Sequence, residues 1–100
     1  MNVDISKLAD IDGAMLLQYV IFTSQNSRTG HSIHTNSGLE TPVPYGLAIC
    51  KYEDSEGVYL FYCNSEWKPI TDTWHPNVQA AQAQAAFEYE ELENTWILVT

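Results

Sequence analysis

Apolar residues in this chain fall into short runs separated by polar segments, a pattern that predicts β-strands. Residues 15–24 are rich in β-branched and aromatic side chains. Both the odd and the even positions are largely apolar, as is typical of a strand covered on both faces. Two further runs, residues 45–52 and 58–64, flank the acidic, Ser- and Gly-containing stretch 53–57 and therefore predict a hairpin. Residues 95–99 predict a last strand that returns to the sheet.

The first strand of this predicted hairpin has one face of small side chains. Gly46, Ala48 and Cys50 alternate with larger residues, so they share one face of an extended chain. Something bulky or closely packed should lie against that face. An alanine-rich helix can approach a sheet closely, and we therefore predict that the helix described next packs there.

One main helix is predicted in the C-terminal half. Residues 67–70 fit a short strand, which their proline confines to an edge because it cannot donate a ladder hydrogen bond. Asp72 and Thr73 are candidate helix caps, and Pro76 suits a first turn. Residues 77–92 are rich in alanine and contain no Gly or Pro. At 100° per residue, the stripe expected to face the core is Val78, Ala81, Ala85, Tyr89 and Leu92.

Two aromatic residues near this helix have two interpretations each. Phe87 falls roughly opposite the core-facing stripe, so it is either covered by the N-terminal segment or exposed in a binding patch. Trp74 follows the predicted edge strand, and Trp anchors cores and interfaces alike. We expect the N-terminal segment to cover Phe87 and Trp74 to belong to the core, with the interface as the alternative for both.

The remaining long segment, residues 25–44, is dominated by Ser, Thr, Asn, Gly and Pro. Connections in compact domains are usually about 4–6 residues long, so a loop of this length is either mobile or functional. Residues 1–100 are then one α+β domain. Its predicted architecture is an antiparallel sheet of four to five strands with the single main helix packed on one face.

The charge balance narrows the classes of partner. Thirteen Asp and Glu against four Lys and Arg give a net charge of −9, and nine of the acids lie in residues 51–100. Nucleic acids and anionic lipids are bound through Lys and Arg, so we expect neither a nucleic-acid nor a membrane partner. The same field attracts a basic protein and accelerates the encounter, although net charge also keeps a small protein soluble.

The expected compartment is the cytoplasm. The first ten residues lack the basic and apolar regions of a secretory signal, and the apolar runs, such as residues 14–17, are too short to span a bilayer. With no export signal, Cys50 and Cys63 are expected to be free, buried thiols rather than a disulfide.

The sequence gives only weak evidence for catalytic or metal-binding residues. His31 and His34 are spaced like half of a metal site, but no Cys or carboxylate cluster flanks them. His75 could activate a thiolate, yet both cysteines lie within predicted strands, where thiols are usually inert. The scattered glycines form no phosphate-binding loop, and the carboxylates of residues 88–93 are expected to be solvated rather than paired for acid–base work. We therefore predict no catalytic residue, metal or cofactor, and no enzyme.

A pattern in the C-terminal half resembles a known group of proteins. It runs from Tyr59-Leu-Phe-Tyr-Cys63 through Trp67 and Asp72-Thr-Trp-His75 to Ala81, Gln84-Ala85 and Glu88-Tyr89, and covers residues 57–90. Small uncharacterised acidic bacterial proteins carry a similar pattern, and many proteins of that type resemble immunity proteins that block toxins. The resemblance implies a non-enzymatic inhibitor.

The predicted function is therefore an immunity protein that neutralises a basic bacterial toxin, such as a nuclease, through an acidic surface. The alternative is an acidic adaptor or homo-oligomeric accessory protein, including a homodimer, that inhibits nothing. Apolar anchors would come from Trp74 or Phe87. The residues expected to contact the basic partner are Glu53, Asp54, Glu56, Asp72, Trp74, Phe87, Glu88, Glu90, Glu91 and Glu93.

Overall fold

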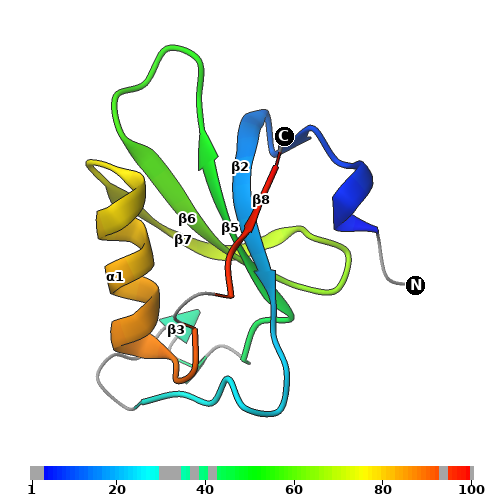
Figure 1. Ribbon diagram of the computed structural model, residues 1–100, viewed down its shortest axis with the longest axis vertical. Helices are drawn as coiled ribbons and strands as arrows, with labels where there is room; N and C mark the ends of the chain where they lie inside the picture. The colour runs from blue at the N-terminus through cyan, green and yellow to red at the C-terminus, as the bar shows by residue number, and fades with distance from the viewer. Residues whose placement is uncertain (1–3, 30–34, 37–38, 41–42, 93–94, 100) are drawn as a thin grey trace.

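An antiparallel sheet forms the centre of the protein, in a computed structural model that describes residues 4–29, 35–36, 39–40, 43–92 and 95–99. Six strands among these residues build the sheet, and they pair in the order β1-β2-β5-β6-β7, with β8 also paired to β2. Figure 1 shows that the sheet curls like half a barrel. The strands are β1 (Asp10–Ile11), β2 (Ala14–Ile21), β5 (Gly46–Lys51), β6 (Val58–Cys63), β7 (Pro69–His75) and β8 (Ile97–Leu98).

Four further elements complete the described fold. A 3₁₀ turn, η1 (Ile5–Lys7), precedes the sheet, and the helix α1 (Val78–Glu88) follows β7. β3 (Thr35–Asn36) and β4 (Leu39–Glu40) pair with each other in a separate two-stranded sheet. The α+β class and the antiparallel sheet are thus confirmed, with six strands in place of the four to five predicted.

The start of the helix differs from the prediction. Asp72 and Thr73 do not cap α1 but lie within β7, where they pair with Phe61 and Leu60 of β6. Asn77 is the N-cap, and its side-chain oxygen accepts from the backbone N–H of Ala80 at 2.8 Å. Strand pairing along the whole of β6, together with the β-branched residues of the 69–75 segment, favours the extended chain over an earlier helix start.

The segment predicted to be a loop, residues 25–44, is partly structured. It contains β3 and β4, and Arg28 forms an isolated antiparallel bridge with Tyr89. Asn26 lies before the bridge and is buried; its Nδ2 donates to the backbone oxygens of Glu90 and Glu91 at 2.9 and 3.2 Å. The beginning of the segment is therefore tied to the end of the helix. His31 and His34 lie outside the described residues.

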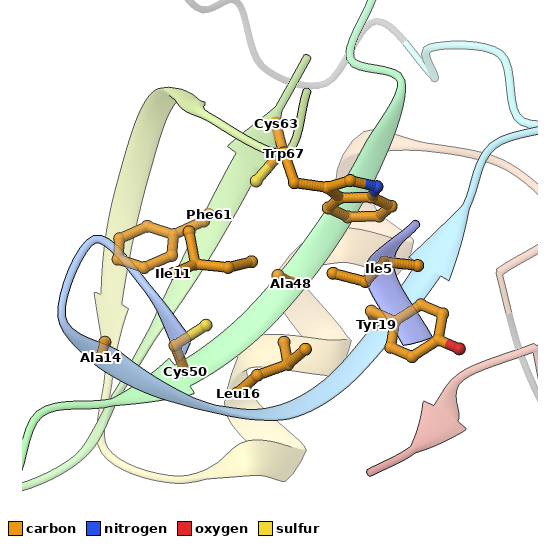
Figure 2. Packing of buried hydrophobic residues seen from close by; sticks show 10 residues of the cluster. All are labelled: Ile5, Ile11, Ala14, Leu16, Tyr19, Ala48, Cys50, Phe61, Cys63 and Trp67. Atoms are coloured by element: carbon orange, nitrogen blue, oxygen red, sulfur yellow. The ribbon is translucent and has the colours of Figure 1, made fainter. Parts of the chain in front are cut away.

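The small face of β5 is filled by an aromatic side chain from the β6–β7 connection. Figure 2 shows Trp67 among the side chains of one buried cluster, and its ring makes edge contacts with Tyr19 and Tyr45 at 6.1 and 5.9 Å between centroids. A Cβ at Gly46 would lie 2.4 Å from Cη2 of Trp67. The bulky neighbour expected for this face is therefore present. The cluster contains Ile5, Ile11, Ala14, Leu16, Tyr19, Ala48, Cys50, Phe61, Cys63 and Trp67.

The alanines of α1 belong to a second cluster, which includes the larger side chains of β5. Ala81 and Ala85 are fully buried with Leu47 and Ile49, and not with Ala48 and Cys50. The predicted pairing of the helix with the small face is thus wrong. Trp67, Ile5 and Ile11 belong to the cluster on that face instead. The cluster also holds Val20, Val58, Leu60, Tyr62, Tyr89 and Leu92.

Phe87 is not covered as expected. Its side chain is 49% exposed, whereas Ile5 and Ile11 of the N-terminal segment belong to the cluster that excludes α1. The exposed alternative is therefore the observed one. Cys50 and Cys63 are free and buried, as predicted. Among the described residues, no helix has the length and apolar character needed to cross a membrane.

Candidate functional site

Five of the predicted contact residues come together at one end of the sheet. Glu53, Asp54 and Glu56 are exposed in the β5–β6 turn, and Asp72 and Trp74 are exposed on β7, the neighbour of β6. We call these five residues the hairpin surface. Within the described part of the chain, no Lys or Arg forms an ion pair with its four acids. The surface therefore combines acids that form no ion pair within the described residues with a large aromatic side chain.

A hydrogen bond fixes Trp74 to the acidic turn. Its indole Nε1 donates to the backbone oxygen of Glu56 at 2.9 Å. The side chain is 51% exposed, so the expectation that Trp74 belongs to the core is wrong. Gly57 makes room for the ring, because a Cβ there would lie 2.7 Å from Trp74 Nε1 and 2.5 Å from the oxygen of His75. The glycine also has a φ of +81°, which other residues rarely adopt. The turn and the aromatic anchor thus form one unit.

Two half-buried tyrosines continue the surface across the sheet. Tyr59 pairs directly with Trp74 across β6 and β7. The Tyr52 ring meets the Tyr59 ring edge-to-face, with centroids 5.4 Å apart. We call Tyr52, Tyr59 and Trp74 the aromatic row. Burial, followed by the charges of Asp12 and Asp72, raises the pKa of Tyr52, so these two carboxylates act on the row as well.

The acids predicted at the end of the helix lie elsewhere. Glu90 and Glu91 are exposed just beyond α1, and Glu90 accepts from the hydroxyl of Ser27 at 2.9 Å. Figure 1 places this end of α1 at the opposite end of the molecule from the β5–β6 turn. Phe87 belongs to the same end of α1, and Glu93 lies outside the described residues. The predicted contact residues therefore divide into two groups.

Glu88 differs from its expected solvated position. It is 3% exposed, and its carboxylate accepts from the hydroxyl of Tyr62 and, at 3.0 Å, from Nε2 of Gln84. Tyr62 is also 3.4 Å from the Thr73 hydroxyl, which in turn lies 2.7 Å from Nε2 of His75. We call these five residues the polar network. It links α1, β6 and β7 through buried and half-buried side chains. Glu88 itself is buried, so it is unsuited to meeting a partner directly.

Helical periodicity alone places Glu88 on the buried face of α1, but its charge led to the expectation that it is solvated. Glu88 lies seven residues after Ala81 and three after Ala85, so it shares the buried stripe of the helix. Gln84 lies four residues before Glu88 on the same helix, so their contact is a local i,i+4 pair. Tyr62 and Thr73 carried no such signal, because their contact depends on how β6 and β7 pair. The network residues all belong to the sequence pattern of residues 57–90 described above, which favours a structural meaning for that pattern.

The cysteines and His75 are not arranged for nucleophilic chemistry. Burial raises the pKa of Cys63 to about 12 and raises the pKa of Cys50 further, so both thiols keep their protons at neutral pH. His75 contacts Thr73 rather than a cysteine. Burial lowers the pKa of His75, and the nearby charge of Glu88 partly opposes that shift.

Stability should decrease in alkaline solution because several buried groups hold their protons more tightly when folded. The pKa values of Cys50, Cys63, Tyr62 and Tyr89 are all raised, chiefly by burial. The unfolded chain releases these protons first, from the ordinary cysteine and tyrosine pKa values of about 8.5 and 10, so the free energy of unfolding falls as pH rises through this range. Urea unfolding at pH 7 to 11 measures the fall. Cys63→Ala should flatten its first part, and an unchanged slope would contradict the assignment.

Comparison of the chain with protein-family models, with curated proteins and with solved structures finds no match. The geometry of the hairpin surface and of the polar network is therefore the basis on which a function is proposed.

Proposed function

We propose that the protein is a non-enzymatic binding module whose hairpin surface covers a cationic region of a partner protein. The observation that carries the proposal is the bond from Trp74 to the backbone of Glu56, because it joins a half-exposed aromatic anchor to three exposed acids. Interfaces typically combine a central aromatic or Arg anchor with a polar rim, and rim charges mainly steer the encounter. The hairpin surface has both parts.

The rest of the fold supports an open hairpin surface. We take α1 to pack on one face of the sheet, as the cluster shared by Ala81, Ala85 and Leu60 supports. Trp74 and Asp72 pair with Tyr59 and Phe61, whose side chains belong to the other face. The helix would then stabilise the sheet without covering the residues that meet the partner.

The specific form of the proposal is an inhibitor, namely an immunity protein that neutralises a basic bacterial toxin in the cytoplasm. It rests on the sequence pattern of residues 57–90 and on the acidic charge. A toxin that acts on nucleic acid needs a cationic substrate groove, and an acidic surface with an aromatic anchor is suited to covering such a groove. Co-expression provides the test, because a true inhibitor should restore growth to cells that produce the captured toxin.

Two matched charge reversals test which surface binds. Glu53→Lys/Glu56→Lys and Glu90→Lys/Glu91→Lys change the net charge equally but lie at opposite ends of the molecule. We expect the hairpin variant to weaken binding of the captured basic partner by about tenfold or more, since each rim charge contributes roughly 0.5–1 kcal/mol. The variant at the helix end should bind within about twofold of the wild type.

The measurement is calorimetric titration of the partner at low and high salt, with urea unfolding as a check on folding. Wild-type affinity should fall as ionic strength rises, because exposed charges are screened. Equal binding by the wild type and the hairpin variant would remove the hairpin surface from the interface.

The accessory-protein alternative is favoured by one observation at another edge. The β8 residues Ile97 and Leu98 are 46% and 64% exposed, and Val99 beyond them is 39% exposed. Exposed apolar side chains on an edge strand suit pairing with a second copy. Sedimentation equilibrium separates the two proposals, because a monomer at all concentrations argues against the homodimer.

A further inference from the structure

The residues of the aromatic row are positioned by strand pairing. Tyr59 pairs with Cys50 on one side and with Trp74 on the other, and Tyr52 lies two residues beyond Cys50 on the same face. The Tyr59 ring stacks on Phe61, which is 2% exposed, with centroids 6.1 Å apart and planes inclined by 21°. The partly exposed Tyr59 ring is thus packed beside a buried ring of the core.

Two carboxylates near this row belong to two different elements. Asp12 lies in the β1–β2 turn, and Asp72 lies on β7, two residues before Trp74. The charges of both act on the hydroxyl of Tyr52. The β1–β2 turn also packs against this ring, since a Cβ on Gly13 would lie 4.0 Å from Tyr52 Cε1. Two carboxylates from separate elements therefore lie near the row.

Aromatic faces beside carboxylates favour one kind of cation. A guanidinium group is planar and weakly hydrated, so it can stack on a ring and still donate two hydrogen bonds to a carboxylate. An ammonium group is compact and strongly hydrated, and it lacks the planar fork. On this basis we propose that the aromatic row, with Asp12 and Asp72, binds arginine side chains of the partner in preference to lysine. This inference rests on the proposed function and names the group that the hairpin surface recognises.

A hollow of about 520 Å³ lies beside Tyr52 and is lined by Met15, Asp10 and Glu53 together with Lys51, Ala9 and Gly13. Met15 and Lys51 pair with each other and alternate with Leu16 and Cys50, which belong to the cluster on the face of the aromatic row. Their side chains therefore point to the other face of the sheet, and the hollow is not part of the arginine site.

Three peptides of equal length test the preference. Each is a capped glycine peptide with three spaced residues, which are arginine in the first, lysine in the second and uncharged citrulline in the third. Titration into the full chain, followed by tryptophan fluorescence and calorimetry, gives the dissociation constants. We expect the arginine peptide to bind about fivefold tighter than the lysine peptide. The citrulline peptide should not bind measurably.

Two variants of Trp74 test whether its aromatic ring gives the preference for arginine. Trp74→Leu removes the aromatic face, and the preference for arginine should fall to less than about twofold. Trp74→Phe keeps a ring while losing the indole N–H, so the preference should be largely retained. Trp74 is half exposed, and unfolding by urea should show that both variants remain folded.

The outcomes distinguish this inference from the proposed function. Equal binding of the arginine and lysine peptides, or an unchanged preference in Trp74→Leu, would overturn the inference. If the basic partner is nevertheless lost in Glu53→Lys/Glu56→Lys, the proposed function stands without it. If the partner binds that variant normally while the peptide preference holds, the row recognises arginine but the hairpin surface is not the partner's interface.

Discussion

Gly46→Ala should destabilise the protein by about 3 kcal/mol or more, a large fraction of the roughly 5–15 kcal/mol that stabilises a domain. The added Cβ would lie 2.4 Å from Cη2 of Trp67 and 2.6 Å from the backbone oxygen of Val20. Neither atom can move cheaply. The Val20 oxygen belongs to β2, which pairs with β5 alongside, and Trp67 is 2% exposed within the cluster of Figure 2. Urea unfolding measures the loss.

Two comparisons isolate the clash from other effects. Gly13→Ala introduces the same methyl group where the nearest atom is 4.0 Å away, so its cost is the φ of +83° alone, about 1–2 kcal/mol. Trp67→Leu should make part of the room that Gly46→Ala needs, so the double variant should lose less stability than the two single losses combined. Strict additivity of the pair would show that Trp67 is not what the methyl group meets.

The Trp67 contact also shows why the sequence predicted a bulky neighbour but not its identity. Gly46, Ala48 and Cys50 indicated that something large lies on their face, and alanines in a helix were the obvious complement. The residue that fills this face is Trp67. It lies in a tight turn in which Asn64 Oδ1 accepts from the N–H groups of Glu66 and Lys68 at 2.9 and 3.1 Å. The turn itself is local, but the face that Trp67 meets depends on how β5, β6 and β7 pair, which local pattern does not encode.

Strand predictions succeeded where apolar runs were long and failed where they were short. β5 and β6 lie within the predicted ranges, and β2 begins one residue before its range, because their cores are continuous apolar runs. β1 and η1 contain two and three residues, too few to show a period, although Ile5 and Ile11 in them are buried. The first residues of β7 fall in the predicted strand 67–70, but the rest of it was mistaken for the approach to the helix. Asp72 and Thr73 are good caps in isolation and become strand residues through pairing with β6.

The same limit applies to the candidate site. Composition indicated Glu53, Asp54, Glu56, Asp72 and Trp74, and the β6–β7 register then brought them together. Tyr52 and Tyr59 were not predicted to take part. Their contribution depends on their position diagonal to each other across the hairpin, which follows from the register of β5 and β6.

Glu88→Ala should cost about 3–5 kcal/mol, comparable to breaking a buried charged interaction elsewhere. The carboxylate is 3% exposed and accepts from Tyr62 and Gln84, so truncation removes an acceptor from two buried or half-buried donors at once. Glu88→Gln keeps a side-chain oxygen at the same reach and should lose less, about 1–2 kcal/mol.

Glu91→Ala is the matched control for this loss, since it removes an exposed carboxylate just beyond the same helix and should change the free energy of unfolding by less than about 0.5 kcal/mol. Glu88→Ala should also leave the arginine preference of the peptides unchanged at temperatures where the variant is folded, because the polar network lies on the side of the sheet away from the aromatic row. Equal stabilities of Glu88→Ala and Glu91→Ala would contradict the structural role of the network. Loss of peptide binding in a folded Glu88→Ala would instead connect the network to the hairpin surface.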